Sequence, residues 1–144
     1  MDIVVDVDGT IADASWRQHH LLVKPKNWNG FWKDMEKDPS YDDIVWLVKQ
    51  LHSNGNRIII CTGRQYRHRE QTEFWLKQND IPYNEIYMRE TDDHRDDSIV
   101  KVELINQMRK DGYDPYLILE DRDRVVKAYR DIGLRVLQVK YGDF

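Results

Sequence analysis

Five short apolar runs, rich in valine and isoleucine, constrain the fold of this chain more than any other feature. They are Asp2–Val7, Arg57–Cys61, Glu85–Met88, Tyr116–Leu119 and Arg135–Val139. Continuous apolar runs of this length are typical of strands that are buried on both faces of a sheet. Segments with helical spacing lie between the later runs; in residues 44–51 apolar side chains recur at i, i+3, i+4 and i+7. Strands that alternate with helices predict an α/β fold with a parallel five-stranded sheet flanked by helices.

The length and composition favour one globular domain over residues 1–144, because domains typically hold about 100–200 residues. Hydrophobic residues make up 40% and charged residues 33%, which argues against a disordered chain. The formal charge of −4 argues against a general nucleic-acid coat protein but leaves a local basic cleft open. No apolar run approaches the ~20 residues of a membrane helix, so we expect no membrane association.

The single cysteine, Cys61, cannot form an intrachain disulfide, which predicts a reducing cytoplasm. Met1 leads directly into the first apolar run without a secretory signal, and this also predicts that the protein is not exported. The sequence allows no inference about a protein partner.

One stretch, residues 14–40, lacks a clear period and contains Trp16, Trp28, Phe31 and Trp32. It follows the first predicted strand directly, so we expect a small insertion over the carboxyl end of the sheet, where α/β folds bind ligands. The alternative is that these rings only fill a small satellite core. Both interpretations remain open from the sequence.

A pair of carboxylates follows the first predicted strand, in the segment Asp6-Val7-Asp8-Gly9-Thr10. Residues two apart on a strand share a face, so the two carboxylates repel each other and favour a hard cation such as Mg²⁺. A nucleophilic carboxylate beside a carboxyl acid–base group is suited to phosphoryl transfer. An EF-hand is excluded because its twelfth position would be Arg17. A solvated Asp-Gly turn remains the alternative.

Four motifs in order resemble those of the haloacid-dehalogenase (HAD) superfamily of phosphatases. They are Asp6–Thr10, Thr62-Gly63-Arg64, Lys101 and Glu120-Asp121. Each lies at the carboxyl end of a predicted strand or at the start of the next helix, which is more specific than any one motif. The resemblance implies a Rossmann-like HAD core, with residues 14–40 as a minimal cap after the first strand.

The chain resembles more closely the 3′-phosphatase domain of phage polynucleotide kinase/phosphatases, from Met1 to Phe144 and least in the aromatic insertion. In that family an arginine lies eleven positions after the nucleophilic aspartate, as Arg17 follows Asp6. The family often has aspartate where this chain has Glu120. No glycine here is followed by lysine, so no Walker A motif is present and a free-standing phosphatase domain is expected. A phage-encoded protein of this kind would act in the host cytoplasm.

The resemblance implies four catalytic residues. Asp6 attacks phosphorus, Asp8 protonates the leaving hydroxyl and then deprotonates water, and Thr62 and Lys101 contact the phosphate. It also implies a Mg²⁺ cofactor, held by the Asp6 carboxylate, the Asp8 carbonyl and Asp121, with Glu120 beside it.

Substrate-binding residues are implied by the same resemblance. Arg17 and Arg64 supply bidentate donors to a phosphate, and Gly63 belongs to the same motif as Arg64. Asp97 precedes Lys101 by four residues and is expected to direct its ammonium toward the phosphate; a surface ion pair is the alternative. The rings expected to stack on a base are those of Trp16, Trp28 and Trp32.

These observations predict a Mg²⁺-dependent phosphomonoesterase that acts on nucleotide substrates through an aspartyl-phosphate. The first hypothesis is removal of 3′-phosphates from nucleic-acid ends. The second is a phosphatase of free nucleoside monophosphates, in which the same rings clamp one nucleoside. A catalytically silent end-binding module ranks below both, because Asp6 and Asp8 are both present.

Overall fold

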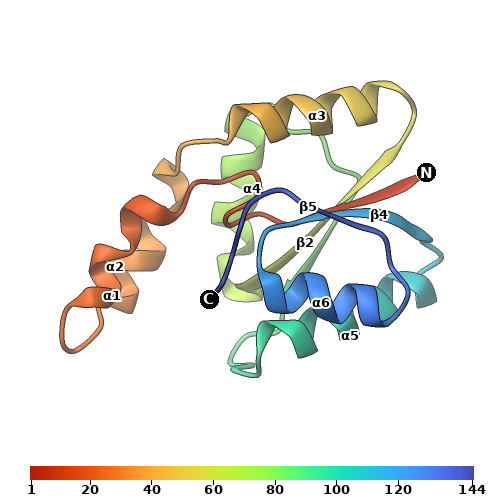
Figure 1. The fold of residues 1–144 in the computed structure, drawn as a ribbon. Helices are drawn as coiled ribbons and strands as arrows, with labels where there is room; N and C mark the ends of the chain where they lie inside the picture. The colour runs from red at the N-terminus through yellow and green to blue at the C-terminus, as the bar shows by residue number, and fades with distance from the viewer.

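A single parallel sheet of five strands forms the centre of the molecule (Figure 1). The computed structural model describes residues 1–144. The strands are β1 (Asp2–Val5), β2 (Arg57–Gln65), β3 (Glu85–Arg89), β4 (Pro115–Glu120) and β5 (Val136–Gln138). Their order is β3-β2-β1-β4-β5, and every neighbouring pair is parallel. The predicted α/β class and parallel five-stranded sheet are therefore confirmed.

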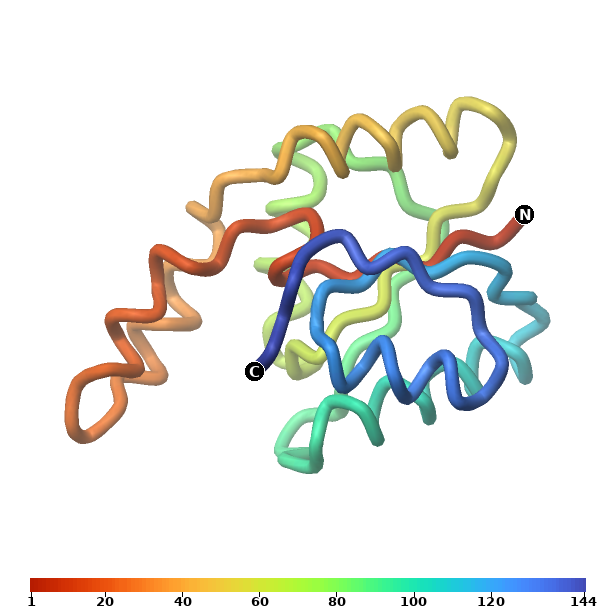
Figure 2. The backbone as a smooth tube through the Cα atoms, viewed as in Figure 1, coloured from red at the N-terminus to blue at the C-terminus, as the bar shows by residue number.

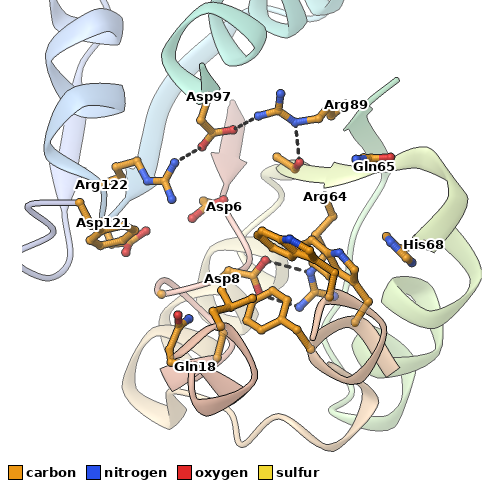
Figure 3. Close-up of a pocket in the computed structure, with 18 of the residues that line it drawn as sticks. Asp6, Asp8, Gln18, Arg64, Gln65, His68, Arg89, Asp97, Asp121 and Arg122 are labelled. Atoms are coloured by element: carbon orange, nitrogen blue, oxygen red, sulfur yellow. Dashed lines mark hydrogen bonds and ion pairs between the residues drawn. The ribbon is translucent and has the colours of Figure 1, made fainter. Parts of the chain in front are cut away.

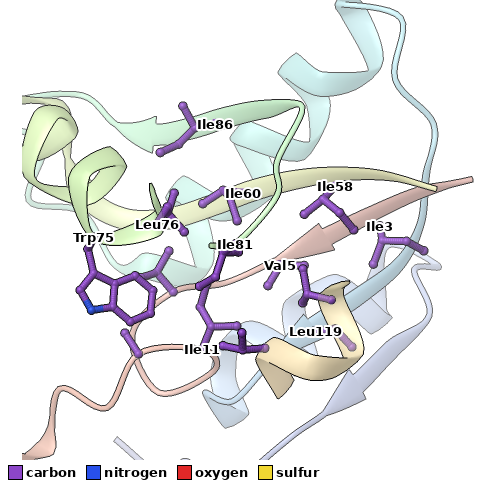
Figure 4. Packing of buried hydrophobic residues seen from close by; sticks show 14 of the residues in the cluster. Ile3, Val5, Ile11, Ile58, Ile60, Trp75, Leu76, Ile81, Ile86 and Leu119 are labelled. Atoms are coloured by element: carbon purple, nitrogen blue, oxygen red, sulfur yellow. The ribbon is translucent and has the colours of Figure 1, made fainter. Parts of the chain in front are cut away.

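Helices cover both faces of this sheet. Helices α3 (Asp42–Ser53) and α4 (Arg69–Gln78) lie on one face, and α5 (Asp97–Lys110) and α6 (Asp123–Asp131) on the other (Figure 1). Alternate residues of a strand point to opposite faces. Accordingly Ile3 and Val5 pack in the same cluster as Trp75 of α4 (Figure 4), whereas Val4 packs in the cluster that contains Tyr129 of α6.

The strand order creates a switch point between β1 and β4. The chain builds β2 and β3 on one side of β1, then crosses through α5 to place β4 and β5 on the other side. Val5 pairs with Leu119, so Asp6 after β1 and Glu120 at the end of β4 emerge at the same edge. Ligand sites of open α/β sheets form at such a point.

The insertion, residues 14–40, projects beyond the carboxyl edge of the sheet (Figures 1 and 2). It consists of a 3₁₀ turn (Ser15–Arg17), α1 (His19–Leu22), α2 (Trp28–Lys33) and a second 3₁₀ turn (Asp34–Lys37). Phe31 and Met35 are buried, whereas 48% of Trp28 is exposed. Within the insertion Phe31 packs edge-on against Trp28 and Trp32, and part of this aromatic surface remains open to solvent.

The ends of two strands differ from the prediction. Strand β1 ends at Val5 rather than Val7, because the backbone turns at residues 7–12, where three N–H groups donate to the Val7 carbonyl. Strand β2 continues past Cys61 to Gln65, through a register shift in its pairing with β3. Helices α3 and α4 both pack on the core, yet their tryptophans differ: Trp75 of α4 is buried, whereas 61% of Trp46 is exposed on α3.

None of the helices combines the length and the apolar character that a bilayer-spanning segment requires.

Candidate active site

A cavity of about 1190 Å³ lies between the insertion and the carboxyl ends of the strands (Figure 3). The core contributes charged side chains to its wall, among them Asp6, Asp8, Arg64, Asp97, Lys101, Glu120 and Asp121. The insertion contributes Trp28, Phe31 and Trp32. Segments distant in sequence thus bring acidic, basic and aromatic groups to one cavity.

Asp6 and Lys101 form the buried centre of this site. Lys101 Nζ donates to Asp6 Oδ1 at 2.7 Å and to Glu120 Oε2 at 2.6 Å. Burial and the Glu120 carboxylate raise the pKa of Asp6 well above its usual range, although Lys101 acts against this. Burial would lower the pKa of Lys101, but Asp6, Asp97 and Glu120 outweigh it and hold that pKa above the usual value. Lys101 therefore stays positively charged and lies in contact with Asp6, the predicted nucleophile.

Asp121 completes an acidic cluster with Asp6 and Glu120, whose ligand oxygens lie within 4.8 Å of one another. Thr10 Oγ1 lies 3.1 Å from Asp6 Oδ2 and 3.3 Å from Asp121 Oδ1. Burial and the Glu120 charge raise the pKa of Asp121 to about 6. Gly9 has φ +84°, and a Cβ there would lie 2.1 Å from Asp121 Oδ2. Only glycine lets the turn approach this carboxylate so closely.

The donor atoms of this cluster fit a hard divalent cation, since all are oxygens. Both oxygens of Glu120 are already engaged: Oε2 by Lys101, and Oε1 by the N–H groups of Asp121 and Arg122. In contrast, no donor of the chain hydrogen-bonds to the backbone carbonyl of Asp8. The groups available to a metal are therefore the Asp6 and Asp121 carboxylates and the Asp8 carbonyl, and Glu120 supports them.

Asp97 joins Lys101 to two arginines (Figure 3). Its carboxylate lies 3.6 Å from Lys101 Nζ, 3.1 Å from Arg89 and 3.5 Å from Arg122. Helix α5 begins at Asp97, so the expected i,i+4 pair with Lys101 is present, and it is buried rather than on the surface. A Cβ at Gly63 would lie 2.2 Å from Asp97 Oδ1. Gly63 therefore makes room for the carboxylate that orients Lys101.

Asp8 is held by the two arginines that we expected to contact a phosphate. Arg64 donates to both of its oxygens, at 2.7 and 3.0 Å, and Arg17 donates to Oδ1 at 3.2 Å. Burial acts against the ionised form, but Arg64 and Arg17 prevail and hold the pKa of Asp8 below its usual value. The Asp8 side chain is 34% exposed and faces the cavity, whereas both arginine side chains are fully buried.

Asp38 is a site residue that sequence reasoning missed. Its carboxylate accepts two hydrogen bonds of 2.7 Å from Arg17 and one of 2.8 Å from Trp16 Nε1, and lies 3.5 Å from Arg64. Its backbone carbonyl accepts from Trp75 Nε1 of α4 at 2.8 Å. Asp38 thus joins the insertion to the core and fixes the arginines that hold Asp8. No local pattern identifies it, because its partner Arg17 lies 21 residues away.

Three of the predicted site residues are not among those that line the cavity. Arg17 does not line the cavity, because every nitrogen of its guanidinium is bonded within the chain, one of them to the Phe31 carbonyl. The Thr62 side chain is buried and accepts the Arg64 N–H at 3.1 Å. Trp16 lies outside the cavity lining.

Trp28 and Trp32 do line the cavity, and Trp32 stacks on a histidine that we did not predict. Their rings are 19° from parallel with centroids 6.3 Å apart, and Trp32 stacks on His68 at 4.8 Å and 25°. His68 also lines the cavity, close to the start of α4 (Figure 3). The three rings form one stacked series at the wall of the cavity.

Comparison with known protein families identifies the family to which this chain belongs. The family described as the polynucleotide kinase PNKP phosphatase domain matches residues 1–144. The chain belongs to this family. It is therefore a phosphatase of the HAD type, as the four motifs predicted, and its neighbours among solved structures include other HAD hydrolases.

Related proteins agree with this assignment. A protein of Autographa californica nuclear polyhedrosis virus, named as a candidate bifunctional polynucleotide kinase/RNA ligase, is 26% identical over 92% of this chain. A chain of the Pnkp1/Rnl/Hen1 RNA repair complex superposes with a TM-score of 0.86 at 29% identity over 99% of this chain. A class C acid phosphatase of Bacillus anthracis shares the fold, with a TM-score of 0.72 at 16% identity, 98% of this chain and 65% of that chain. This PNKP-type phosphatase chain spans 18% of the viral relative and 43% of the repair-complex chain.

Proposed function

We propose that residues 1–144 act as one PNKP-type phosphatase domain that removes 3′-phosphates from nucleic-acid ends, with Mg²⁺ and an aspartyl-phosphate intermediate. Residues 14–40 serve as its small cap. The observation that carries the proposal is the placement of Asp6 between a buried Lys101 and an all-oxygen cluster, in a cavity with an aromatic wall. Cys61, the only cysteine, is free and buried. Because a free thiol suits a reducing environment, we place the reaction in a reducing cytoplasm.

In the first step an Asp6 carboxylate oxygen attacks phosphorus. The new O–P bond forms as the bond from phosphorus to the 3′-oxygen breaks, and the leaving oxygen takes a proton from Asp8. Lys101 favours the ionised form of Asp6, against the burial and the Glu120 charge that raise its pKa, and offers positive charge beside the transferring phosphoryl group. Asp97 holds the ammonium in that direction.

Asp8 changes its protonation state between the two steps. In the free protein Arg64 and Arg17 favour the carboxylate. An incoming phosphate brings negative charge close to Asp8 and competes for Arg64, and both effects favour the protonated form that the first step needs. In the second step the carboxylate takes a proton from the water that attacks phosphorus, and Asp6 is released.

A Mg²⁺ ion would be held by the Asp6 and Asp121 carboxylates and by the Asp8 carbonyl. It would neutralise charge on the phosphate oxygens. Glu120 holds Lys101 and the backbone of Asp121 in place around it.

Two observations support a nucleic-acid end as the substrate. The family and the relatives are named for polynucleotides, and the aromatic rings of Trp28, Trp32 and His68 line the cavity, where a base can extend their stack. The same wall suits a single nucleoside, so a nucleoside monophosphate phosphatase is the second candidate.

The test compares kcat/KM for Mg²⁺-dependent phosphate release from a 3′-phosphorylated oligonucleotide with that from nucleoside 3′- and 5′-monophosphates. We expect the oligonucleotide to be preferred; turnover of monophosphates alone would contradict the proposal. Asp6→Asn, which has the same shape, should abolish release while circular dichroism shows an unchanged fold. Strand binding without release by the unsubstituted protein would instead indicate an end-binding module.

A further inference from the structure

The projecting part of the insertion carries an unbalanced positive charge. Residues 18–33, which we call the cap hairpin, contain Lys24, Lys26 and Lys33 but no aspartate or glutamate. The whole chain has a formal charge of −4. All three lysines are exposed, and none forms an ion pair with a carboxylate. A patch of this kind in an acidic protein marks where an anionic partner approaches.

The cap hairpin is continuous with the cavity. Leu21, Trp28 and Lys33 line the cavity, and the turn between α1 and α2 extends away from the body of the protein (Figures 1 and 2). At that turn Leu22 is 81% exposed and Val23 51% exposed. A strand whose end lies at Asp6 can therefore leave the cavity along the hairpin without crossing another element.

Aromatic rings and lysines follow one another along this path. The stacked series of His68, Trp32 and Trp28 begins in the cavity, and the Lys26 ammonium lies 5.8 Å from the centre of the Trp28 ring. Surfaces that bind single strands combine rings for the bases with cations for the phosphates. An acidic peptide would use the lysines, but it would leave the ring series without a role.

We propose that the cap hairpin binds the part of a single-stranded nucleic acid that continues from the terminal nucleotide, with Lys24 and Lys26 on its backbone phosphates. This inference rests on the proposed function, since it places the body of the polymer whose end reacts at Asp6. Phosphodiester charge and base faces are common to RNA and DNA, so matched oligomers of both kinds enter the test.

The test uses the double variant Lys24→Ala/Lys26→Ala, with Lys77→Ala/Lys110→Ala as the matched control. The control lysines are exposed at the ends of α4 and α5, at the opposite edge of the sheet. The substrates are 3′-phosphorylated RNA and DNA oligomers of one to about twelve nucleotides, a length that covers the usual single-strand site.

We expect kcat/KM of the unsubstituted protein to rise with length. In the hairpin variant this rise should be reduced by roughly tenfold for the longest oligomer, with one-nucleotide substrates unaffected. The slope of log kcat/KM against log salt should fall by about 1.4, because each lost single-strand phosphate contact contributes about 0.7. The control variant should behave like the unsubstituted protein.

The outcomes separate the two proposals. If the unsubstituted protein releases phosphate from long oligomers no faster than from monophosphates, the polymer-end function itself is wrong. If it prefers long oligomers but the hairpin variant matches the control, only the hairpin proposal is overturned. An equal loss on one-nucleotide and long substrates also overturns it, because the lysines would then act at the terminal phosphate.

Discussion

The buried carboxylate of Asp38 should be worth several kilocalories per mole to this fold, and Asp38→Asn tests this. The substitution keeps the size of the side chain and one acceptor oxygen but removes the charge opposite Arg17. At present Arg17 donates twice to Asp38 at 2.7 Å, and both side chains are fully buried. Removing one partner of such a pair costs about 3–5 kcal/mol, because it leaves a buried charge without its partner.

The expected value lies at the lower end of that range, about 3 kcal/mol, since Asp8 remains 3.2 Å from Arg17 as a counter-charge. For a chain of this length such a loss lowers Tm by roughly 10 °C. Urea denaturation followed by circular dichroism measures it as a lower midpoint with an unchanged m-value.

The control is Asp34→Asn, in the same insertion. Asp34 contacts His20 and Lys37 nearer the surface, and its removal should leave Tm close to that of the unsubstituted chain. A loss below about 1 kcal/mol for Asp38→Asn, as for an exposed pair, would refute the reasoning about burial.

Three further predictions concern the site and its surroundings. Gly63→Ala places a methyl group against the Asp97 carboxylate and should lower kcat/KM by about 100-fold, with little change in KM; unchanged kinetics would contradict the close approach. Burial raises the pKa of the Cys61 thiol to about 12, so iodoacetamide at pH 8 should modify it only in urea; native labelling, read by mass spectrometry, would disprove this. Burial and Glu120 raise the pKa of Asp121 to about 6, above its value in the unfolded chain. Without metal this difference stabilises the fold below about pH 4, and the stabilisation is lost as the pH rises through 6. Because Mg²⁺ favours the ionised form, the rise in Tm that it causes should grow from about pH 5 to 7; a shift independent of pH would argue against Asp121 as a ligand.

The strands and the acidic centre could be predicted from sequence because their signals are local. Apolar runs fix the strands, and the carboxyl ends of parallel strands meet at one edge, so Asp6 and Asp121 had to lie close together. The exposure of Trp46 follows from the helical spacing of the apolar residues in 44–51. It lies two positions after Ile44, on the opposite face of the helix from the apolar stripe.

The partners of the arginines could not be predicted, because they depend on how the insertion folds back. Arg17 lies behind the site, where its carboxylate partners are Asp8 and Asp38. Residues 14–40 have no period from which an inward face can be derived. His68 likewise joins the cavity wall only because Trp32 of the insertion lies against it.

The hydrogen bonds of Asp38 have a consequence for how substrates are selected. They fasten the insertion to β2 through Arg64 and to α4 through Trp75, and they hold Arg17, which in turn donates to Asp8 in the loop after β1. An enzyme with a hinged lid tests its substrate by whether the lid can close. Here the insertion is fixed, so the entrance to the cavity stays open. A molecule is then selected by its width and by its fit to a wall that is already formed. Turnover should then follow the rates of entry and chemistry, without a slow closing movement between them.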